Sequence, residues 1–339
     1  MPLYDSILDT IGRTPIVKLH HLPPKHVSLY VKVESFNPGG SVKDRLALAV
    51  VLDAEAKGLL KPGDTIVECT SGNVGIALAM VAAARGYNFV ALMGDGYSVE
   101  RRKLIRAYGG KVILFPSGEG SSGGNLRADR LAAKYGWFRA KQFDNQANPA
   151  YHRQTTAGEI LGDFAGKRLD YFVTGFGTSG TLTGVGQMLK LARPEVRIIV
   201  VEPVNAALLA GHEWYVHKIQ GLAPNFRPSV LDDSVIDTLM SVDEEVARDT
   251  ARRLAAEEGI FAGISAGASL STALRVAESA PQGSVLLAML PDTGERYLST
   301  FLFDGINEGS DDEWLASLEG SIKLFPKPER RTVEVELGA

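Results

Sequence analysis

A lysine inside a glycine-rich turn is the first residue of this sequence that could do chemistry. Lys43 lies in the run Asn37 to Arg45, N-P-G-G-S-V-K-D-R, whose first four residues are typical of a turn. Apolar alternation from Val27 to Ser35 predicts a strand before the turn, and the Ala- and Leu-rich stretch Leu46 to Lys57 predicts a helix after it. The positive end of that helix would disfavour a protonated amine, so a lysine that forms a Schiff base with an aldehyde is one interpretation. A surface lysine paired with Asp44 is the other.

A second loop, Gly175 to Thr181, reads G-F-G-T-S-G-T and lies between a predicted strand and a predicted helix. With Glu202 further along, it fits the G-x-G-x-x-G fingerprint of dinucleotide-binding enzymes, so an NAD-dependent dehydrogenase is an alternative function. Hydroxyl groups and backbone N–H groups at a helix start would also suit one compact phosphate monoester. The loop alone leaves the identity of the anion open.

Two further turns place polar residues after predicted strands. Thr70 to Asn73 reads T-S-G-N and could bind a carboxylate or simply cap a helix. Leu290 to Tyr297 places the hydroxyl of Thr293 just past a buried strand, where open α/β sheets bind ligands. Ser265 lies in a G-x-S-x-G sequence, but no ordered Asp and His partners follow it, so a helix cap is the preferred interpretation.

Composition excludes several classes of protein. A net charge of −4 and a pI near 5.9 give no basis for nucleic-acid binding or a polybasic membrane contact. No apolar run approaches the ~20 residues that span a bilayer, and the N-terminus lacks a secretory signal, so a cytoplasmic protein is expected. A single cysteine, Cys69, excludes intramolecular disulfides, and the six histidines lack metal-binding spacing, so no metal is expected.

Strands and helices alternate along the chain, which predicts an α/β fold with mostly parallel sheets covered by helices. The Gly- and Ser-rich residues Ser117 to Gly124 are predicted to form a loop, and Ala206 to Pro228 an irregular, mobile segment. Ser241 is predicted to open a helix that runs to Glu258, as part of a capping box.

Ordered motifs from Pro15 to about Phe303 resemble the fold-type-II pyridoxal-phosphate enzymes, and the cysteine synthase and cystathionine β-synthase family most closely. The motifs are N-P-G-G-S-V-K-D-R, T-S-G-N, E-R-R-K-L, Q-F-x-N-x-A-N-P, G-x-G-T-x-G-T-L-T-G, K-I-Q-G, G-I-S-A-G-A and G-E-R-Y-L-S-T. Their number favours pyridoxal 5'-phosphate over a dinucleotide. The resemblance implies a tryptophan synthase β-like architecture with two α/β domains: residues 1–38 plus 151–308 form the larger, cofactor-binding domain, residues 39–150 a smaller mobile insert, and residues 309–339 a tail.

The resemblance also implies roles for individual residues. Lys43 would be catalytic and bind the cofactor as a Schiff base, with Asn73 at the cofactor's phenolic oxygen and Thr293 at its pyridine nitrogen. A neutral hydroxyl at that nitrogen favours β-elimination and replacement over transamination. The cofactor phosphate would contact Gly177, Thr178, Ser179, Gly180 and Thr181. The substrate carboxylate would contact Thr70, Ser71, Gly72 and Gln142.

The reaction implied is β-replacement on a β-substituted L-serine, above all that of cysteine synthase: O-acetyl-L-serine and sulfide give L-cysteine and acetate. O-phospho-L-serine or serine with another nucleophile, as in cystathionine β-synthase, is an alternative. A catalytically silent pyridoxal-phosphate-binding partner is another. The resemblance further implies a homodimer and a possible association with serine acetyltransferase.

Three departures from the usual cysteine synthase sequence lie beside the expected site. Val74 replaces the threonine of T-S-G-N-T-G, and residues 93–98 and 221–228 differ from the usual M-P-E-T-M-S and G-I-G-A-G-F-I-P. A leaving group or nucleophile other than those of O-acetyl-L-serine and sulfide is therefore an alternative. Arg227 could bind the phosphate of O-phospho-L-serine, or it could pair with Asp232 or Asp233.

Overall fold

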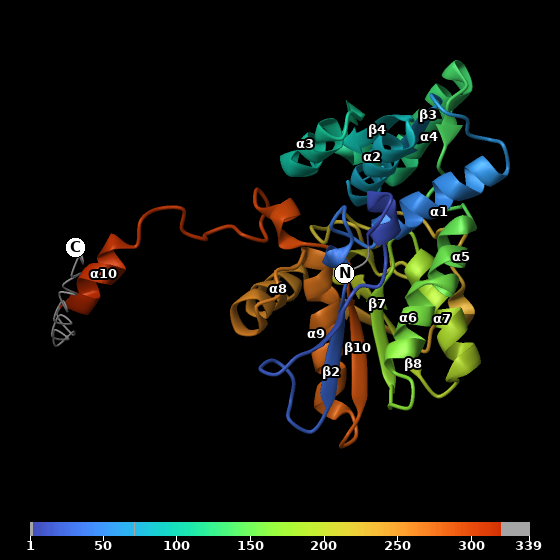
Figure 1. Cartoon of the computed structure of the whole chain (residues 1–339). Helices are drawn as coiled ribbons and strands as arrows, with labels where there is room; N and C mark the ends of the chain where they lie inside the picture. Colours follow the sequence, from blue (N-terminus) through green and yellow to red (C-terminus); the bar gives the residue numbers. More distant parts are fainter. Residues whose placement is uncertain (1–2, 71, 320–339) are drawn as a thin grey trace, which may run out of the picture. The chain divides into compact units, whose positions relative to one another are not determined.

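Six strands form the larger of two β-sheets, in the order β1-β2-β10-β7-β8-β9 (Figure 1). The computed structural model describes residues 3–70 and 72–319. All neighbours in this sheet run parallel except β1 and β2. The strands are β1 (Ile16–Lys18), β2 (Ser28–Val33), β7 (Tyr171–Gly175), β8 (Arg197–Pro203), β9 (Thr238–Val242) and β10 (Val285–Leu290).

Four parallel strands form the smaller sheet, in the order β5-β4-β3-β6. They are β3 (Thr65–Cys69), β4 (Asn88–Gly94), β5 (Lys111–Phe115) and β6 (Phe138–Arg139). All four fall between β2 and β7 in the chain, so the larger sheet is built from the segments on either side of the smaller one. The predicted α/β class with mostly parallel sheets is confirmed.

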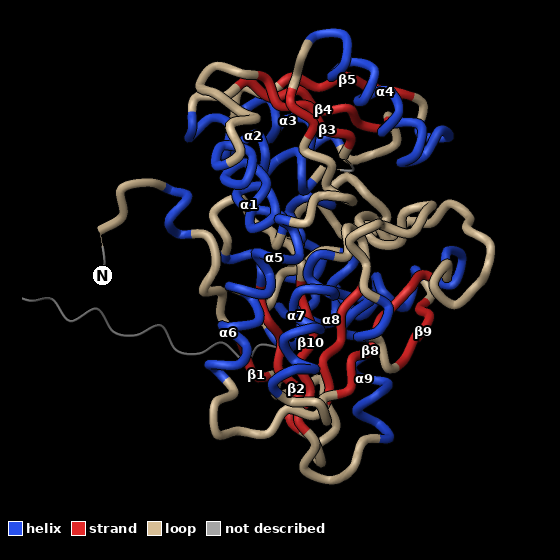
Figure 2. Tube along the Cα trace, turned by 90° about the vertical axis from the view of Figure 1, so that its right-hand side faces the viewer, coloured by secondary structure: helices blue, strands red, loops and turns tan. Residues whose placement is uncertain are grey.

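Helices cover both sheets. They are α1 (Lys43–Ala56), α2 (Asn73–Arg85), α3 (Val99–Ala107), α4 (Gly120–Tyr135), α5 (Ala147–Gln154), α6 (Thr156–Asp163), α7 (Gly180–Ala192), α8 (Glu244–Glu258) and α9 (Ile264–Ser279). A further helix, α10 (Asp312–Glu319), follows the unit that carries the sheets. In two perpendicular views α1 lies between the sheets, packed against α2 on one side and α5 on the other (Figures 1 and 2). Helix α1 therefore joins the two halves of the fold.

The larger sheet is buried on both faces, because its strands alternate between two apolar cores. Leu287 and Met289 of β10 pack in the core that includes α6 and α7, whereas Leu286, Ala288 and Leu290 pack against α9 on the other face. Two-sided burial explains why these strands are apolar along their whole length in the sequence.

Two local predictions are wrong. Helix α4 begins at Gly120, inside the predicted loop, and its Gly124 lies so close to β3 and β5 that a side chain there would overlap the Cys69 sulfur and the Phe115 ring. Ser241 does not cap a helix: it lies in β9, and the side chain of Asp243 caps α8 by accepting the N–H of Glu245. The described residues from Ala207 to Asp232 form no helix or strand, as predicted; their mobility stays a prediction.

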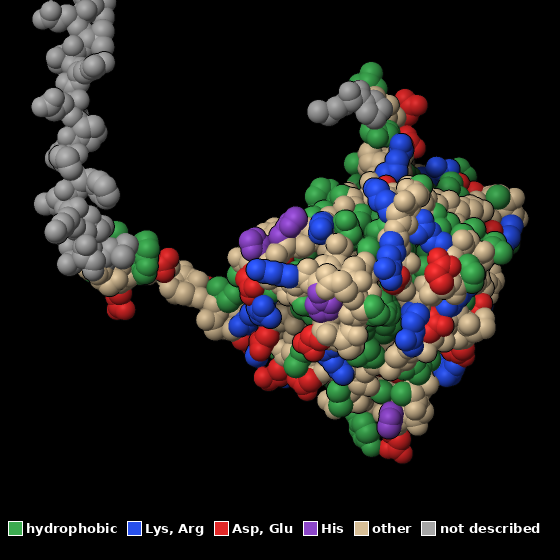
Figure 3. Space-filling model, turned by 90° about the horizontal axis from the view of Figure 1, so that it is seen from below, with side chains coloured by type: hydrophobic (Ala, Val, Ile, Leu, Met, Phe, Trp, Pro, Cys, Tyr) green, Lys and Arg blue, Asp and Glu red, His purple; other side chains and the backbone are tan. Residues whose placement is uncertain are grey.

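Contact density divides the chain at Phe303 into a unit that carries both sheets and a unit that begins at Asp304 and includes α10. Movement of residues 39–150 as a separate domain stays a prediction. Acidic and basic side chains are interspersed on the face in Figure 3, in keeping with the small net charge. Within the described ranges, no helix is long and apolar enough to cross a membrane.

Candidate active site

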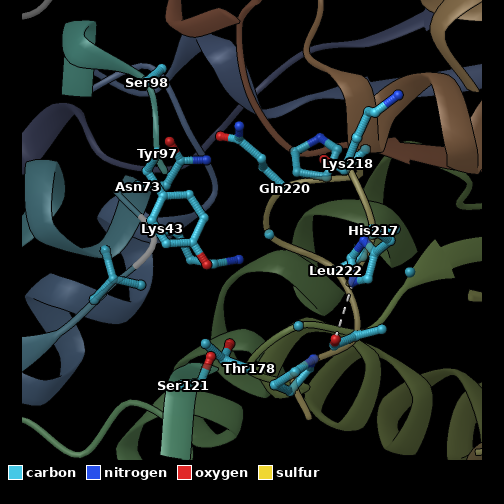
Figure 4. Close-up of a pocket in the computed structure, with 18 of the residues that line it drawn as sticks. Lys43, Asn73, Tyr97, Ser98, Ser121, Thr178, His217, Lys218, Gln220 and Leu222 are labelled. Carbon is cyan, nitrogen blue, oxygen red and sulfur yellow. Dashed lines mark hydrogen bonds between the residues drawn. The ribbon is translucent and has the colours of Figure 1, made fainter. Parts of the chain in front are cut away.

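The carboxyl ends of the parallel strands and the N-termini of six helices surround a cavity of about 830 Å³ (Figure 4). Because a helix N-terminus carries a partial positive charge, this arrangement favours anionic ligands. The helices contribute to the lining at or within two residues of their first residue, through Lys43 (α1), Asn73 (α2), Val99 (α3), Gly120 (α4), Thr181 (α7) and Ser265 (α9).

Lys43 is the first residue of α1 and faces the cavity. The turn before it is held by Asp44, whose carboxylate accepts the N–H of Gly39 at 2.6 Å. Burial lowers the pKa of Lys43, because the charged amine loses its hydration, while the negative charges of Asp292 and Glu34 act to raise it. Burial is thus the main cause of the lowered pKa of Lys43, whereas the prediction from the sequence gave the helix dipole as the cause. A lower pKa leaves more of the amine in its neutral form, which is the form that can attack an aldehyde.

Asn73 begins α2 and lines the cavity on the same wall as Lys43 (Figure 4). Its Nδ2 donates to Asp292 Oδ2 at 2.7 Å, and its Oδ1 accepts from Arg296 Nη1 at 2.6 Å. Both partners follow β10, so a segment of the larger sheet holds the first residue of a helix that covers the smaller sheet.

The glycine-rich loop between β7 and α7 forms another wall. Gly177, Thr178, Ser179 and Thr181 line the cavity, and Gly180 begins α7. No side chain caps this helix, and the buried Oγ of Ser179 has no hydrogen-bond partner in the described part of the chain. A buried hydroxyl without a partner is costly in a folded protein unless a ligand completes it, so the loop suits an external anion.

The expected carboxylate site is only partly assembled at the cavity. Gln142 and Val74 line it, whereas the Thr70 hydroxyl accepts the N–H groups of Gly72 and Gly75 at 3.0 and 3.1 Å. Gly72 has a φ of +138°, which glycine adopts without strain. Ser71 lies outside the described residues. The backbone therefore places this loop at the cavity edge, and its role in substrate binding stays a prediction.

Besides Thr70, Gly72 and Gly180, the predicted site residues Thr293 and Arg227 do not line the cavity as the structure describes it. Thr293 pairs with Ala262 in an isolated β-bridge, while the buried hydroxyl residue Ser265 lines the cavity instead. Arg227 forms an ion pair with Asp233 at the surface, the second of the two arrangements considered for it. Binding of a phosphate leaving group by Arg227 gains no support from this position.

The wall opposite Lys43 was only partly identified from the sequence, which placed residues 221–228 beside the site but assigned no role to His217 or Gln220. This wall includes His217, Gln220 and Leu222 (Figure 4). His217 Nε2 lies 3.4 Å from the carbonyl oxygen of Ala223, and burial lowers the pKa of His217, which favours the neutral imidazole. The K-I-Q-G motif contained the signal that could have identified Gln220.

The family model described as "Pyridoxal-phosphate dependent enzyme" matches residues 7–292. This chain is a member of that family. Over 300 residues it is 46% identical to cysteine synthase of Staphylococcus aureus strain N315, with 88% of this chain and 97% of the relative covered. Over 319 residues it is 79% identical to O-ureido-L-serine synthase of Streptomyces lavendulae, with 94% and 98% covered. The pyridoxal-phosphate enzyme is thus of the cysteine synthase type.

Solved structures agree with this assignment. The O-ureido-L-serine-bound K43A mutant of O-ureido-L-serine synthase matches with a TM-score of 0.93 and 79% identity, covering 94% of this chain and 99% of the other. Cysteine synthase from Entamoeba histolytica matches with a TM-score of 0.85 and 37% identity, covering 94% and 96%. The fold of this pyridoxal-phosphate enzyme is therefore that of the fold-type-II class.

The residues at the cavity fit pyridoxal phosphate. Lys43, whose pKa is lowered, faces the cavity and would bind the aldehyde, and an uncapped helix N-terminus with a buried, unpartnered Ser179 hydroxyl suits the phosphate. Asn73 and Ser265 supply neutral polar groups for the ring. Each chemical part of the cofactor thus has a matching side chain or backbone group.

Proposed function

We propose that this enzyme replaces the β-substituent of an activated L-serine with hydroxyurea and so forms O-ureido-L-serine. The observation that carries the proposal is the 79% identity, over 94% of this chain, to an O-ureido-L-serine synthase. The product is serine whose side-chain oxygen bears –NH–CO–NH₂, so the nucleophile is HO–NH–CO–NH₂, which reacts through its hydroxyl oxygen. With O-acetyl-L-serine, the Cβ–O bond to acetate breaks and a Cβ–O bond to hydroxyurea forms.

Lys43 has two tasks in this proposal. It holds the cofactor by its amine and, once displaced by the amino acid, takes the proton from Cα and later returns one to it. Pyridoxal phosphate, when bound, supplies the electron-withdrawing ring that makes this proton acidic and lets the β-substituent leave. The lowered pKa of Lys43 suits a base that must accept and release a proton near neutral pH.

The anionic groups of the substrates have matching helix ends. The α7 N-terminus with Thr178 and Ser179 would hold the cofactor phosphate. The α2 N-terminus with Gln142 would hold the α-carboxylate of the amino acid. The departing acetate would be stabilised by the same positive ends, which lowers the barrier to its loss.

The segments that depart from the usual cysteine synthase sequence support a change of nucleophile. Gly94 to Ser98 and Gly221 to Pro224 contribute Tyr97 and Leu222 to the cavity lining. Hydroxyurea is planar and bears several hydrogen-bonding groups, whereas sulfide is a single atom. A reshaped entrance is therefore expected where the nucleophile arrives.

Cysteine synthesis from sulfide is the second candidate, since a cysteine synthase is 46% identical over 88% of the chain. The two candidates share the amino-acid substrate, the cofactor and the role of Lys43. They differ only in the nucleophile, so a direct competition separates them.

The test supplies the purified, cofactor-loaded enzyme with O-acetyl-L-serine and equal concentrations of hydroxyurea and sulfide, and identifies products by mass spectrometry. We expect O-ureido-L-serine to form with a higher kcat/KM for hydroxyurea than the S. aureus cysteine synthase shows as a control. Formation of cysteine alone would favour the second candidate. If neither product forms, and the purified protein carries a nucleotide and has no visible chromophore, the dehydrogenase alternative is favoured. O-phospho-L-serine in place of the acetyl ester tests the leaving group.

Three further parts of the proposal follow from family resemblance. The enzyme would be a cytoplasmic homodimer, and serine acetyltransferase, which makes O-acetyl-L-serine, would be its partner. Size-exclusion chromatography with light scattering tests the dimer, and co-elution with the acetyltransferase tests the association.

A further inference from the structure

The chemistry of its two partners fixes the orientation of the Asn73 carboxamide. Arg296 can only donate, so the group facing it at 2.6 Å must be the carbonyl oxygen of Asn73. A carboxylate can only accept, so the group facing Asp292 at 2.7 Å must be the amide nitrogen. Rotating the amide by 180° would oppose a donor to a donor and an acceptor to an acceptor, which excludes the flipped state.

Both partners are themselves held in place. Asp292 is 1% exposed, and the same Oδ2 accepts the hydroxyl of Tyr297 at 2.7 Å. Arg296 is 3% exposed, donates through Nη2 to the carbonyl oxygen of Gly39, and accepts the Ser98 hydroxyl at its own carbonyl at 2.9 Å. Buried, multiply bonded groups lose little further entropy when they hold a third residue, so this pair forms a rigid support.

We propose that Asp292 and Arg296 act as a clamp that makes Asn73 present an N–H, and not a carbonyl oxygen, to the phenolic oxygen of the cofactor. The two residues are positioning residues, and the inference rests on the proposed function because Asn73 is the residue expected at that oxygen. Nδ2 carries two hydrogens, and Asp292 uses one, so the other is free to donate to a ligand in the cavity that Asn73 lines.

The consequence concerns the proton on the lysine nitrogen that binds the cofactor. The phenolic oxygen is negatively charged whether or not that nitrogen carries its proton, and this charge favours the protonated nitrogen. A donor beside the oxygen disperses the charge and so makes the proton easier to lose. Asp292 and Glu34 also act on Lys43 directly through their charges. A test must therefore separate an effect transmitted by Asn73 from a direct effect of charge.

The experiment titrates with pH the visible absorbance of the lysine-bound cofactor, which depends on that proton, in holoenzyme variants. Asp292→Ala removes the acceptor, and the matched control Asp292→Asn removes the charge but keeps an oxygen that can face Asn73. We expect the midpoint of Asp292→Ala to lie about one pH unit above that of Asp292→Asn, on the scale of one charged hydrogen bond, because both variants lose the charge but only Asp292→Ala releases the amide of Asn73. In an Asn73→Ala background the two variants should have the same midpoint.

A difference between the two variants that persists in the Asn73→Ala background, or equal midpoints when Asn73 is present, would overturn the clamp in favour of direct charge. If Asp292→Ala fails to fold, as circular dichroism would reveal, Arg296→Lys provides the second arm. Arg296→Lys keeps the charge but loses the planar fork between Asn73 and Gly39. Any shift of the midpoint that it causes must therefore vanish in the Asn73→Ala background. A wild-type enzyme without visible absorbance would instead overturn the proposed function.

Discussion

Ser265 and Thr293 are both candidates for the hydroxyl that would lie beside the pyridine nitrogen of the cofactor. Ser265 is 4% exposed and lines the cavity at the start of α9, whereas Thr293 pairs with Ala262 outside the described lining. Ser265→Ala should weaken pyridoxal-phosphate binding about 5- to 10-fold, which corresponds to one neutral hydrogen bond, while Thr293→Val should change it little. Absorbance titration of the apo-enzyme with the cofactor measures both, and the opposite ranking would restore Thr293.

Residue types and spacing identified the chemical centre of the site but not every member of it. Lys43 and the 177–181 loop have distinctive neighbours in the chain, and they lie at one cavity. From the sequence, Thr293 was assigned to the pyridine nitrogen and Ser265 to a helix cap, although each is a hydroxyl residue at the end of a predicted element. Arg227 was misleading for another reason: its partner Asp233 is six residues away, and a local ion pair needs no ligand.

At the scale of elements, a buried ionic cluster fastens α1 to the larger sheet. Glu159 of α6 accepts from Arg45 of α1 at 2.6 Å and from Lys32 of β2 at 2.8 Å, and both basic side chains are fully buried. Glu159→Gln would leave two buried positive charges with less compensation. We expect it to lower the free energy of unfolding at pH 7 by about 3 to 5 kcal/mol, measured by urea denaturation.

The pH dependence of that loss has a definite sign. Although burial acts to raise it, the hydrogen bonds and charges of Arg45 and Lys32 lower the pKa of Glu159 to about 2. Since the folded-state pKa lies below the unfolded value, its stabilisation is complete above about pH 4.5 and is lost as the pH falls towards 2. Wild type and Glu159→Gln should therefore converge in stability over that range. A difference that stays constant with pH would point to packing instead.

Alternating apolar strands and glycine-terminated helices were enough to predict most elements of the fold. The start of α4 was not predictable, because Gly120 to Gly124 has loop composition and becomes helical through its packing on Cys69 and Phe115. Strand β9 was missed because Ser241 has the sequence context of a helix cap. In both cases a tertiary contact decided between two local conformations.

At the scale of the whole molecule, the described lining of the cavity falls entirely between Val42 and Phe301. The second unit begins at Asp304. Removal of residues 304–339 should therefore leave the affinity for pyridoxal phosphate and the visible absorbance unchanged within about twofold, as measured by the same titration. Loss of the chromophore in a truncated protein that keeps its circular dichroism spectrum would assign the C-terminal unit a part in the site.

The order in which the site can assemble during synthesis follows from the way the segment after β10 supports the beginnings of α1 and α2. In sequence, 219 residues separate Asn73 from Asp292, and 257 separate Gly39 from Arg296. Strand β2 likewise pairs with β10. A nascent chain that has exposed Lys43 and Asn73 therefore lacks the groups that orient them until the segment after β10 has also been made. Contacts of such long separation form late and slowly, so productive cofactor capture follows the synthesis of that segment.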